Sequence, residues 1–256
     1  MRPFVSIQRM TILQIFMTCL FFICTSITPA QTPQRVSGLG VSPAVWGVLE
    51  VPQTPGPHPG VVILGGSAGW RPAYADIAKA FADTGFAALA VDYFAETGRD
   101  TLREDRHKKW LLWQETARNA VTWLQASPHV SGRPIGLVGY SRGAFLAVSM
   151  ASSAPAVKAV VDFFGGGGAG PDSLEKEVRH FPPLLILHGE ADSVVFVASA
   201  LRLRDAVSAQ GGEVVMHLYP GAKHAFNAPW SPAYSEPEAS DSWRRTVEFL
   251  HRKLGN

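Results

Sequence analysis

Short, largely apolar runs recur through residues 44–256, and the segments between them place apolar residues at helical spacing. A run of aliphatic and β-branched residues without alternation is typical of a strand that is buried on both faces. On this basis we predict an alternating strand at residues 44–51 and buried strands at 61–64, 86–91, 135–138, 157–163, 184–187 and 214–218.

The segments between these strands carry one apolar face each, as amphipathic helices do. Trp113, Ala117, Ala120, Val121 and Leu124 are an example, and further helices are predicted at residues 73–84, 144–152, 197–209 and 242–254. Strands that alternate with helices favour a mainly parallel sheet with helices on both faces. Because no repeat or linker interrupts the pattern, we predict one α/β domain over residues 44–256.

The first 30 residues follow a different pattern. Arg2 and Arg9 form a basic start, an apolar run follows at residues 12–24, and a small, polar stretch ends at Ala30. These features predict a secretory signal peptide that is cleaved after Ala30. An uncleaved membrane anchor is the alternative, although the run is short for a span of about 20 residues. Residues 31–43, rich in Pro, Gly, Ser and Gln, are interpreted as a leader.

Removal of such a signal peptide changes the charge balance and the cysteine count. Arg2 and Arg9 are the only charged residues among the first 30, so the rest of the chain has 21 basic and 21 acidic residues. This neutral balance gives no electrostatic reason to expect binding to nucleic acid or to an anionic membrane. Cys19 and Cys24 are the only cysteines, so the mature chain would have no disulfide and no cysteine metal site. The predicted signal peptide is our reason to expect a periplasmic or secreted protein, and a domain of this size without disulfides is not unusual there.

The pentapeptide Gly139-Tyr140-Ser141-Arg142-Gly143 fits the pattern G-x-S-x-G and lies directly between a predicted strand and a predicted helix. A serine at such a sharp turn has its hydroxyl exposed above the sheet. The first N–H groups of the helix also favour negative charge that develops nearby. An ordinary serine that caps a helix is the alternative. In this context we predict that Ser141 is a nucleophile.

A serine nucleophile needs a base, and the base needs an acid that orients it. In folds of this class the acid follows the serine and precedes the histidine, on loops after later strands. Asp192 and Glu190 both follow the predicted strand at residues 184–187. We favour Asp192 because it lies further out on the loop, where it can reach a neighbouring loop.

His224 is the favoured base because it follows the predicted strand at residues 214–218. Other histidines after the acid are less suitable, since His217 lies within that strand and His251 lies within the last helix. His188, at the end of the strand before the acid, is interpreted as structural. A surface histidine in a loop is the alternative reading of His224.

The segment Gly65-Gly66-Ser67-Ala68-Gly69 follows the early buried strand at residues 61–64. Hydrolases of this kind stabilise the reaction's oxyanion with the N–H after the nucleophile and with an N–H from this early loop. Arg142 is therefore the first predicted donor and Ser67 the second, with Ala68 as the nearest alternative. A plain turn or a phosphate-binding loop would also be rich in glycine, but the Gly-Lys-Ser/Thr ending of a phosphate loop is missing.

Together these segments resemble the dienelactone hydrolase family of α/β-hydrolases over roughly residues 45–254. The resemblance rests on residues 139–144, on Leu187-His188-Gly189-Glu190-Ala191-Asp192 and on residues 161–166. The most specific match is Tyr219-Pro220-Gly221-Ala222-Lys223-His224-Ala225-Phe226. The resemblance implies an α/β-hydrolase fold with Ser141, Asp192 and His224 as its catalytic residues.

Two departures from the family pattern concern the reaction centre. The family's namesake enzymes carry a cysteine nucleophile where this chain has Ser141. They also carry a glutamate in the oxyanion loop, where this chain has Gly66. The two changes agree, because a serine needs no carboxylate to hold a resting thiol. The resemblance is therefore closer to the serine-bearing branch of the family, which is broad in its substrates.

The sequence thus predicts a serine hydrolase that cleaves a carboxylic ester, lactone or thioester of a small molecule through an acyl-enzyme, without a cofactor or metal. The same three residues would also serve an acyltransferase or an acylaminopeptidase. A binding protein without catalytic activity is the alternative outside the enzymes.

The substrate pocket is less clearly indicated by the sequence. Residues 93–113 are expected to form part of its wall. Arg99, Arg103 and Arg106 would either meet a substrate carboxylate or form a solvated surface. Trp70, Trp110 and Trp230 would line an apolar acyl site or pack in the core.

Overall fold

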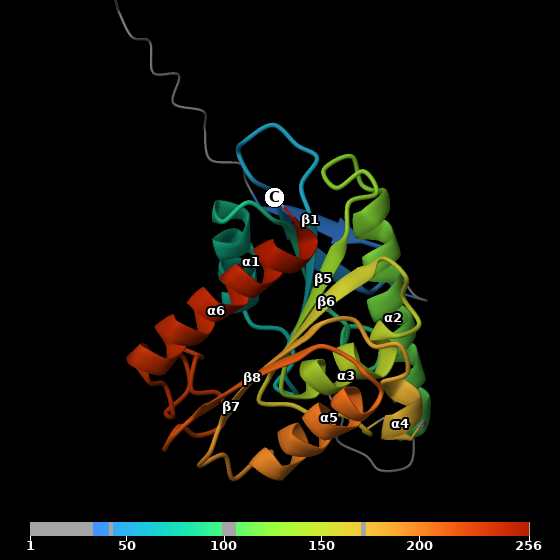
Figure 1. The fold of residues 1–256 in the computed structure, drawn as a ribbon. Helices are drawn as coiled ribbons and strands as arrows, with labels where there is room; N and C mark the ends of the chain where they lie inside the picture. Colours follow the sequence, from blue (N-terminus) through green and yellow to red (C-terminus); the bar gives the residue numbers. More distant parts are fainter. Residues whose placement is uncertain (1–32, 41–42, 99–105, 170–172, 256) are drawn as a thin grey trace, which may run out of the picture. The chain divides into compact units, whose positions relative to one another are not determined.

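Eight strands form one sheet in the computed structural model, which describes residues 33–40, 43–98, 106–169 and 173–255. The sheet order is β1-β2-β4-β3-β5-β6-β7-β8, with β1 and β2 antiparallel to their neighbours and the remaining pairs parallel (Figure 1). The strands are β1 Gln34–Ser37, β2 Trp46–Glu50, β3 Gly60–Leu64, β4 Ala87–Asp92, β5 Ile135–Tyr140, β6 Val157–Phe163, β7 Leu184–Gly189 and β8 Val214–Tyr219.

Helices cover both faces of this sheet (Figure 1). On one face, α2, α3 and α5 share a core with the sheet, and on the other face α1 and α6 do so. The helices are α1 Ala73–Asp83, α2 Arg106–Ala126, α3 Arg142–Ala151, α4 Leu174–Glu177, α5 Val197–Ala209 and α6 Glu236–Leu254. The predicted α/β fold with a mainly parallel sheet is confirmed.

The two cores explain why a central strand such as β3 has no polar side chain at any position. In β3, Val62 and Leu64 belong to the core shared with α2 and α3. Val61 and Ile63, which point to the opposite face, belong to the core shared with α1 and α6. Because successive side chains of a strand point to opposite faces, a strand between two helical layers needs apolar residues throughout.

The largest difference from the sequence prediction lies near the N-terminus. Residues 34–37 fall in the segment interpreted as a leader, but they form β1, which pairs with β2 from Gln34 opposite Leu49 to Ser37 opposite Trp46. Only Val36 of β1 is buried, so the strand carries almost no apolar signal of its own. The predicted signal peptide, residues 1–30, lies outside the described residues. Within the described ranges, no helix is both long and apolar enough to cross a membrane.

The order of the strands reverses between β3 and β5. From β3 the chain first moves outward to β4, and from β5 it moves in the opposite direction through β6, β7 and β8. In open parallel sheets, ligands bind at the carboxyl ends of the strands beside such a reversal. The loop that contains Ser67 and the turn that contains Ser141 follow β3 and β5, so both lie at this point.

The turn between β5 and α3 has no room for larger residues at its two glycines. A Cβ on Gly143 would lie 2.0 Å from the carbonyl oxygen of Leu64, and a Cβ on Gly139 would lie 2.4 Å from the Cα of Ala144. These neighbours are backbone atoms, which cannot move aside as a flexible side chain can. The close approach therefore requires glycine at both positions.

Asp162, in β6, is a fully buried carboxyl group. Its Oδ1 accepts the N–H of Gly165 at 2.8 Å, whereas its Oδ2 has no partner among the described residues. Burial raises the pKa of Asp162 to about 7, although the N–H groups of Gly165 and Gly166 act in the opposite direction. The carboxyl group holds the turn after β6, in which Phe164 has a φ of +42°.

Replacement of Gly143 by Ala is expected to lower the free energy of unfolding by about 3 kcal/mol, because the new methyl group would overlap the carbonyl group of Leu64. Gly66→Ala is the matched control, since a Cβ there meets nothing closer than 3.5 Å. Urea unfolding of both variants measures the difference. Equal stabilities of the two variants would contradict the close approach.

Asp162→Asn is expected to remove a decrease in the free energy of unfolding between about pH 4 and pH 7. In the wild-type protein the folded state keeps a proton on Asp162 up to about pH 7, whereas the unfolded chain releases it near pH 4. The folded state therefore loses stability as the pH rises through this window, by about 4 kcal/mol relative to the variant. Urea unfolding of both proteins at pH 4 to 8 tests this, and parallel stability curves would contradict it.

Candidate active site

Ser141 lies at the tip of the turn between β5 and α3, with φ 52° and ψ −116°. This backbone conformation is uncommon for a residue with a side chain and stores strain. The N–H of Ser141 donates to the carbonyl group of Phe163 at 2.9 Å, so the turn is tied to the end of β6. The strained turn keeps the Ser141 side chain at the carboxyl edge of the sheet, as the pentapeptide predicts.

The ring of His224 joins Ser141 to Asp192. Its Nε2 lies 3.0 Å from Ser141 Oγ, and its Nδ1 lies 2.7 Å from Asp192 Oδ2. A carboxylate can only accept a hydrogen bond, so the ring proton of His224 is on Nδ1. Nε2 therefore has a free lone pair and accepts the hydroxyl hydrogen of Ser141.

Asp192 is 3% exposed, and its environment favours the ionised form. Oδ1 accepts the N–H groups of Val194 and Val195 at 2.8 and 2.9 Å, while Oδ2 faces His224. Burial by itself raises the pKa of Asp192, but the hydrogen bonds from His224, Val195 and Val194 outweigh it and leave the pKa below its usual value. The rival acid, Glu190, is exposed and takes no part in this chain of hydrogen bonds.

The loops after β7 and β8 are held side by side by their backbones. Glu190 N–H donates to the carbonyl group of Tyr219, and Ala191 N–H donates to that of Ala222, both at 3.0 Å. A Cβ on Gly189 would lie 2.3 Å from the carbonyl oxygen of Ala222, so this contact also requires glycine. The two loops therefore approach closely enough for Asp192 to reach His224.

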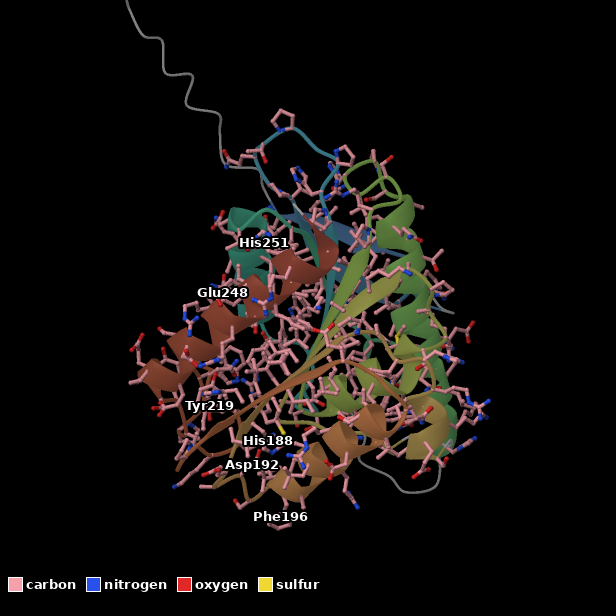
Figure 2. All side chains as sticks on the ribbon, in the orientation of Figure 1. His188, Asp192, Phe196, Tyr219, Glu248 and His251 are labelled. Carbon is pink, nitrogen blue, oxygen red and sulfur yellow. The ribbon has the colours of Figure 1, made fainter. Side chains whose placement is uncertain are left out.

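His188 contacts the loop that carries Asp192, and Figure 2 shows both residues near the end of β7. The His188 side chain is fully buried, and its Nε2 donates to the carbonyl group of Val195 at 2.8 Å. Burial lowers the pKa of His188, against the opposing effects of Val195 and Asp192, so the ring is neutral. This agrees with the structural interpretation of His188 from the sequence.

The two predicted oxyanion donors lie on either side of Ser141. Arg142 is the first residue of α3, and its guanidinium group lies 5.7 Å from the Trp113 ring, toward α2. Ser67 and Ala68 follow β3, are exposed and line the same cavity as Ser141. The N–H of Ser67 has no protein partner within the described ranges. These placements suit the predicted roles of both N–H groups.

A cavity of about 430 Å³ opens beside Ser141 and His224. This volume is within the usual range for small-molecule sites. Its walls are mainly apolar and include Ile77, Phe163, Phe164, Trp230 and Trp243. Within the described ranges, no group of three or more His, Cys, Asp or Glu side chains is arranged to hold a metal ion.

The expectation that residues 93–113 form the pocket wall is wrong for the described part of that segment. Much of the wall comes instead from residues 225–243, between β8 and the first turns of α6, with further parts from α1 and the ends of β5 and β6. Trp230 lines the cavity, Trp70 lines a neighbouring one, and Trp110 is buried against Trp113. Arg99, Arg103 and the side chain of Arg106 lie outside the described residues.

The sequence analysis did not identify three aromatic residues near the site as individual candidates. Phe164 packs against the His224 ring with a centroid distance of 4.9 Å. Tyr74 and Tyr93 form hydrogen bonds to the backbone of the loop after β3, at Gly66 and Gly65. Tyr93 directly follows β4, the neighbour of β3, and this position was the only signal in the sequence that could have indicated its role.

Known proteins resemble this chain over most of its length. A "Putative carboxymethylenebutenolidase" of Methylorubrum extorquens is 25% identical, over 83% of this chain and 77% of the relative. The mitochondrial acyl-coenzyme A thioesterase 2 of Mus musculus is 30% identical over 83% of this chain, which spans only 59% of that relative. A crystal structure named "Putative Dienelactone Hydrolase", from Klebsiella pneumoniae, superposes with a TM-score of 0.76 at 20% identity, and covers 86% of this chain and 98% of that one.

The structural likeness shows the α/β-hydrolase fold, with its eight-stranded, mostly parallel sheet and flanking helices. The family description "Dienelactone hydrolase family" matches residues 45–254. This range contains β2 to β8 and the turns that carry Ser141, Asp192 and His224. The chain therefore belongs to the dienelactone hydrolase family of the α/β-hydrolase superfamily.

Proposed function

We propose that this protein is a serine hydrolase that cleaves a carboxylic ester, lactone or thioester through an acyl-enzyme. Ser141 is the nucleophile, His224 the general base and Asp192 the acid that orients His224. The N–H groups of Arg142 and Ser67 form the oxyanion hole. The observation that carries the proposal is the continuous chain of hydrogen bonds from Asp192 through His224 to Ser141, beside an apolar cavity.

In the first half of the reaction, Ser141 Oγ attacks the carbonyl carbon of the substrate while its proton passes to His224 Nε2. The carbonyl oxygen becomes an oxyanion, which the two backbone N–H groups stabilise. His224 is now positively charged, and the ionised Asp192 stabilises this charge. When the tetrahedral intermediate collapses, the alcohol or thiol leaves with the proton from Nε2.

In the second half, a water molecule gives a proton to His224 Nε2 as its oxygen attacks the acyl carbon. The bond between Ser141 Oγ and the acyl group then breaks, and the proton returns to Oγ. The products are a carboxylic acid and the free enzyme. No group other than the named residues and water is needed to balance these steps.

The mainly apolar walls of the cavity favour an acyl or alkyl group of low polarity. The names of two relatives, a carboxymethylenebutenolidase and an acyl-coenzyme A thioesterase, refer to lactone and thioester substrates and support the same range of bonds. Ser141 and Gly66 replace the cysteine and glutamate of the namesake enzymes. We therefore propose the reaction type for this chain without assigning it the namesake lactone.

A fluorophosphonate probe tests the proposal directly. Ser141 Oγ is expected to attack the phosphorus atom and displace fluoride, so that folded wild-type protein carries the label on Ser141. Ser141→Ala should remain unlabelled and should lower kcat for p-nitrophenyl esters by about 10⁶-fold. If folded wild-type protein is not labelled at Ser141, the proposed function is wrong.

Asp192→Asn is expected to lower kcat by about 10⁴-fold. Because Val194 and Val195 donate to Oδ1, the amide oxygen of asparagine takes that position and its NH₂ group faces His224 Nδ1. The ring proton then moves to Nε2, which can no longer accept the proton of Ser141. Glu190→Gln is the matched control and should keep full activity. Loss of activity in the control with retention in Asp192→Asn would assign the acid to Glu190.

A further inference from the structure

Two tyrosine hydroxyl groups hold the peptide group between Gly65 and Gly66, directly before Ser67. Tyr93 Oη donates to the carbonyl oxygen of Gly65 at 2.7 Å, and the N–H of Gly66 donates to Tyr74 Oη at 2.8 Å. Both polar ends of one peptide group are therefore bonded to side chains. This arrangement fixes the plane of this peptide group and so limits the movement of the loop that carries Ser67.

The two hydroxyl groups differ in whether their hydrogen is already used in a hydrogen bond. Tyr93 uses its hydrogen to bond Gly65, and its side chain is buried away from the cavity. Tyr74 accepts from Gly66, so its hydroxyl hydrogen is still available, and no acceptor for it is present among the described residues. Tyr74 is only 6% exposed, yet it lines the cavity that contains Ser141 and Ser67. A buried donor without an acceptor is costly unless a ligand supplies one.

The position of Gly66 relates the Tyr74 hydroxyl group to the nucleophile. A Cβ on Gly66 would lie 3.6 Å from Ser141 Cβ and 3.9 Å from Tyr74 Oη. The Tyr74 hydroxyl group and the Cβ of Ser141 therefore both lie within 4 Å of the same point beside Gly66. The oxygen of a substrate carbonyl bound at Ser141 and Ser67 would be in this neighbourhood.

We propose that Tyr74 is a further catalytic residue, whose hydroxyl group donates a hydrogen bond to the substrate oxygen that becomes the oxyanion. This inference rests on the proposed function and adds a side-chain donor to the N–H groups of Ser67 and Arg142. The step involves no transfer of the phenolic proton. The hydrogen bond strengthens as negative charge develops on the carbonyl oxygen, so it stabilises the transition state more than the bound substrate.

The protonation of Tyr74 agrees with this role. Burial raises the pKa of the phenol above its usual value, although the Gly66 hydrogen bond and the Arg71 charge lower it in part. The hydroxyl group therefore keeps its hydrogen at neutral pH and can donate it. A water molecule would be the rival acceptor, but the void of about 10 Å³ lined by Gly65, Gly66 and Tyr74 is at the lower limit for one water.

Tyr74→Phe, with Tyr93→Phe as its matched partner, separates donation to the oxyanion from support of the loop. Each variant removes one hydroxyl group and one bond to the same peptide group, but only Tyr74→Phe removes a donor at the cavity. We expect Tyr74→Phe to lower kcat for p-nitrophenyl esters by about 10²-fold with KM within threefold of wild type. Tyr93→Phe should lose less than tenfold.

A trifluoromethyl ketone provides a second measurement, because Ser141 adds to it and forms an oxyanion in the same place. Its affinity should fall in Tyr74→Phe by the same factor as kcat/KM and should change little in Tyr93→Phe. Incorporation of 3-fluorotyrosine at position 74 keeps the ring and the bond to Gly66 but lowers the pKa of the phenol. The alkaline loss of kcat should then begin at a lower pH than in wild type, which support of the loop alone would not produce.

Several results would overturn the role of Tyr74. These are a kcat for Tyr74→Phe within threefold of wild type, equal losses in the two phenylalanine variants, or an unchanged alkaline limb with 3-fluorotyrosine. Urea unfolding of each variant identifies any that has failed to fold, and the fluorotyrosine protein then decides the matter. Labelling of Ser141 by the fluorophosphonate in wild type is measured first. Its absence would refute the proposed function, whereas its presence with an unaffected Tyr74→Phe would refute only the role of Tyr74.

Discussion

The start of α3 lies in direct contact with the end of β3, and the site depends on this approach of two backbone segments. Without a Cβ, Gly143 can pass the carbonyl group of Leu64 at a distance that no other residue allows. This contact places the first residues of α3 beside the loop after β3, and it holds Ser141 in its strained conformation. The proposed nucleophile, Ser141, and the loop after β3 are thus positioned by close packing of the backbone.

Two buried carboxyl groups near the site show how local hydrogen bonding determines charge. Asp192 and Asp162 are both almost inaccessible to solvent. Asp192 receives bonds from His224 and from two backbone N–H groups, and its pKa is lowered despite burial. Asp162 leaves one oxygen without a partner, so burial dominates and its pKa rises to about 7. The ionised Asp192 can stabilise a charged His224, whereas Asp162 keeps its proton to a much higher pH while it holds the turn after β6.

The chain departs from the family's namesake enzymes in the small space beside Gly66. A serine nucleophile with a histidine base needs no carboxylate to hold it, and a glutamate is not present there. The hydroxyl group of Tyr74 adjoins this space and bonds Gly66 instead. Much of the apolar wall comes from residues 225–243, most of which follow His224 in the chain. In the proposed function, the groups that would contact the substrate therefore lie in the segments around α1 and α6, and the proposed reacting groups lie at the ends of the central strands.

The sequence by itself determined the α/β layout, the positions of seven of the eight strands, and Ser141, Asp192 and His224 as candidates. These features are encoded locally, by apolar runs, by glycines at turns and by the order of polar residues after strands. Strand β1, the wall at residues 225–243 and the bonds of Tyr74 and Tyr93 to one peptide group were decided only by the tertiary structure. Each of these features depends on contact between segments that are distant in the chain. Such contacts leave little periodic pattern in the sequence of either segment, because they depend on where the fold brings two surfaces together.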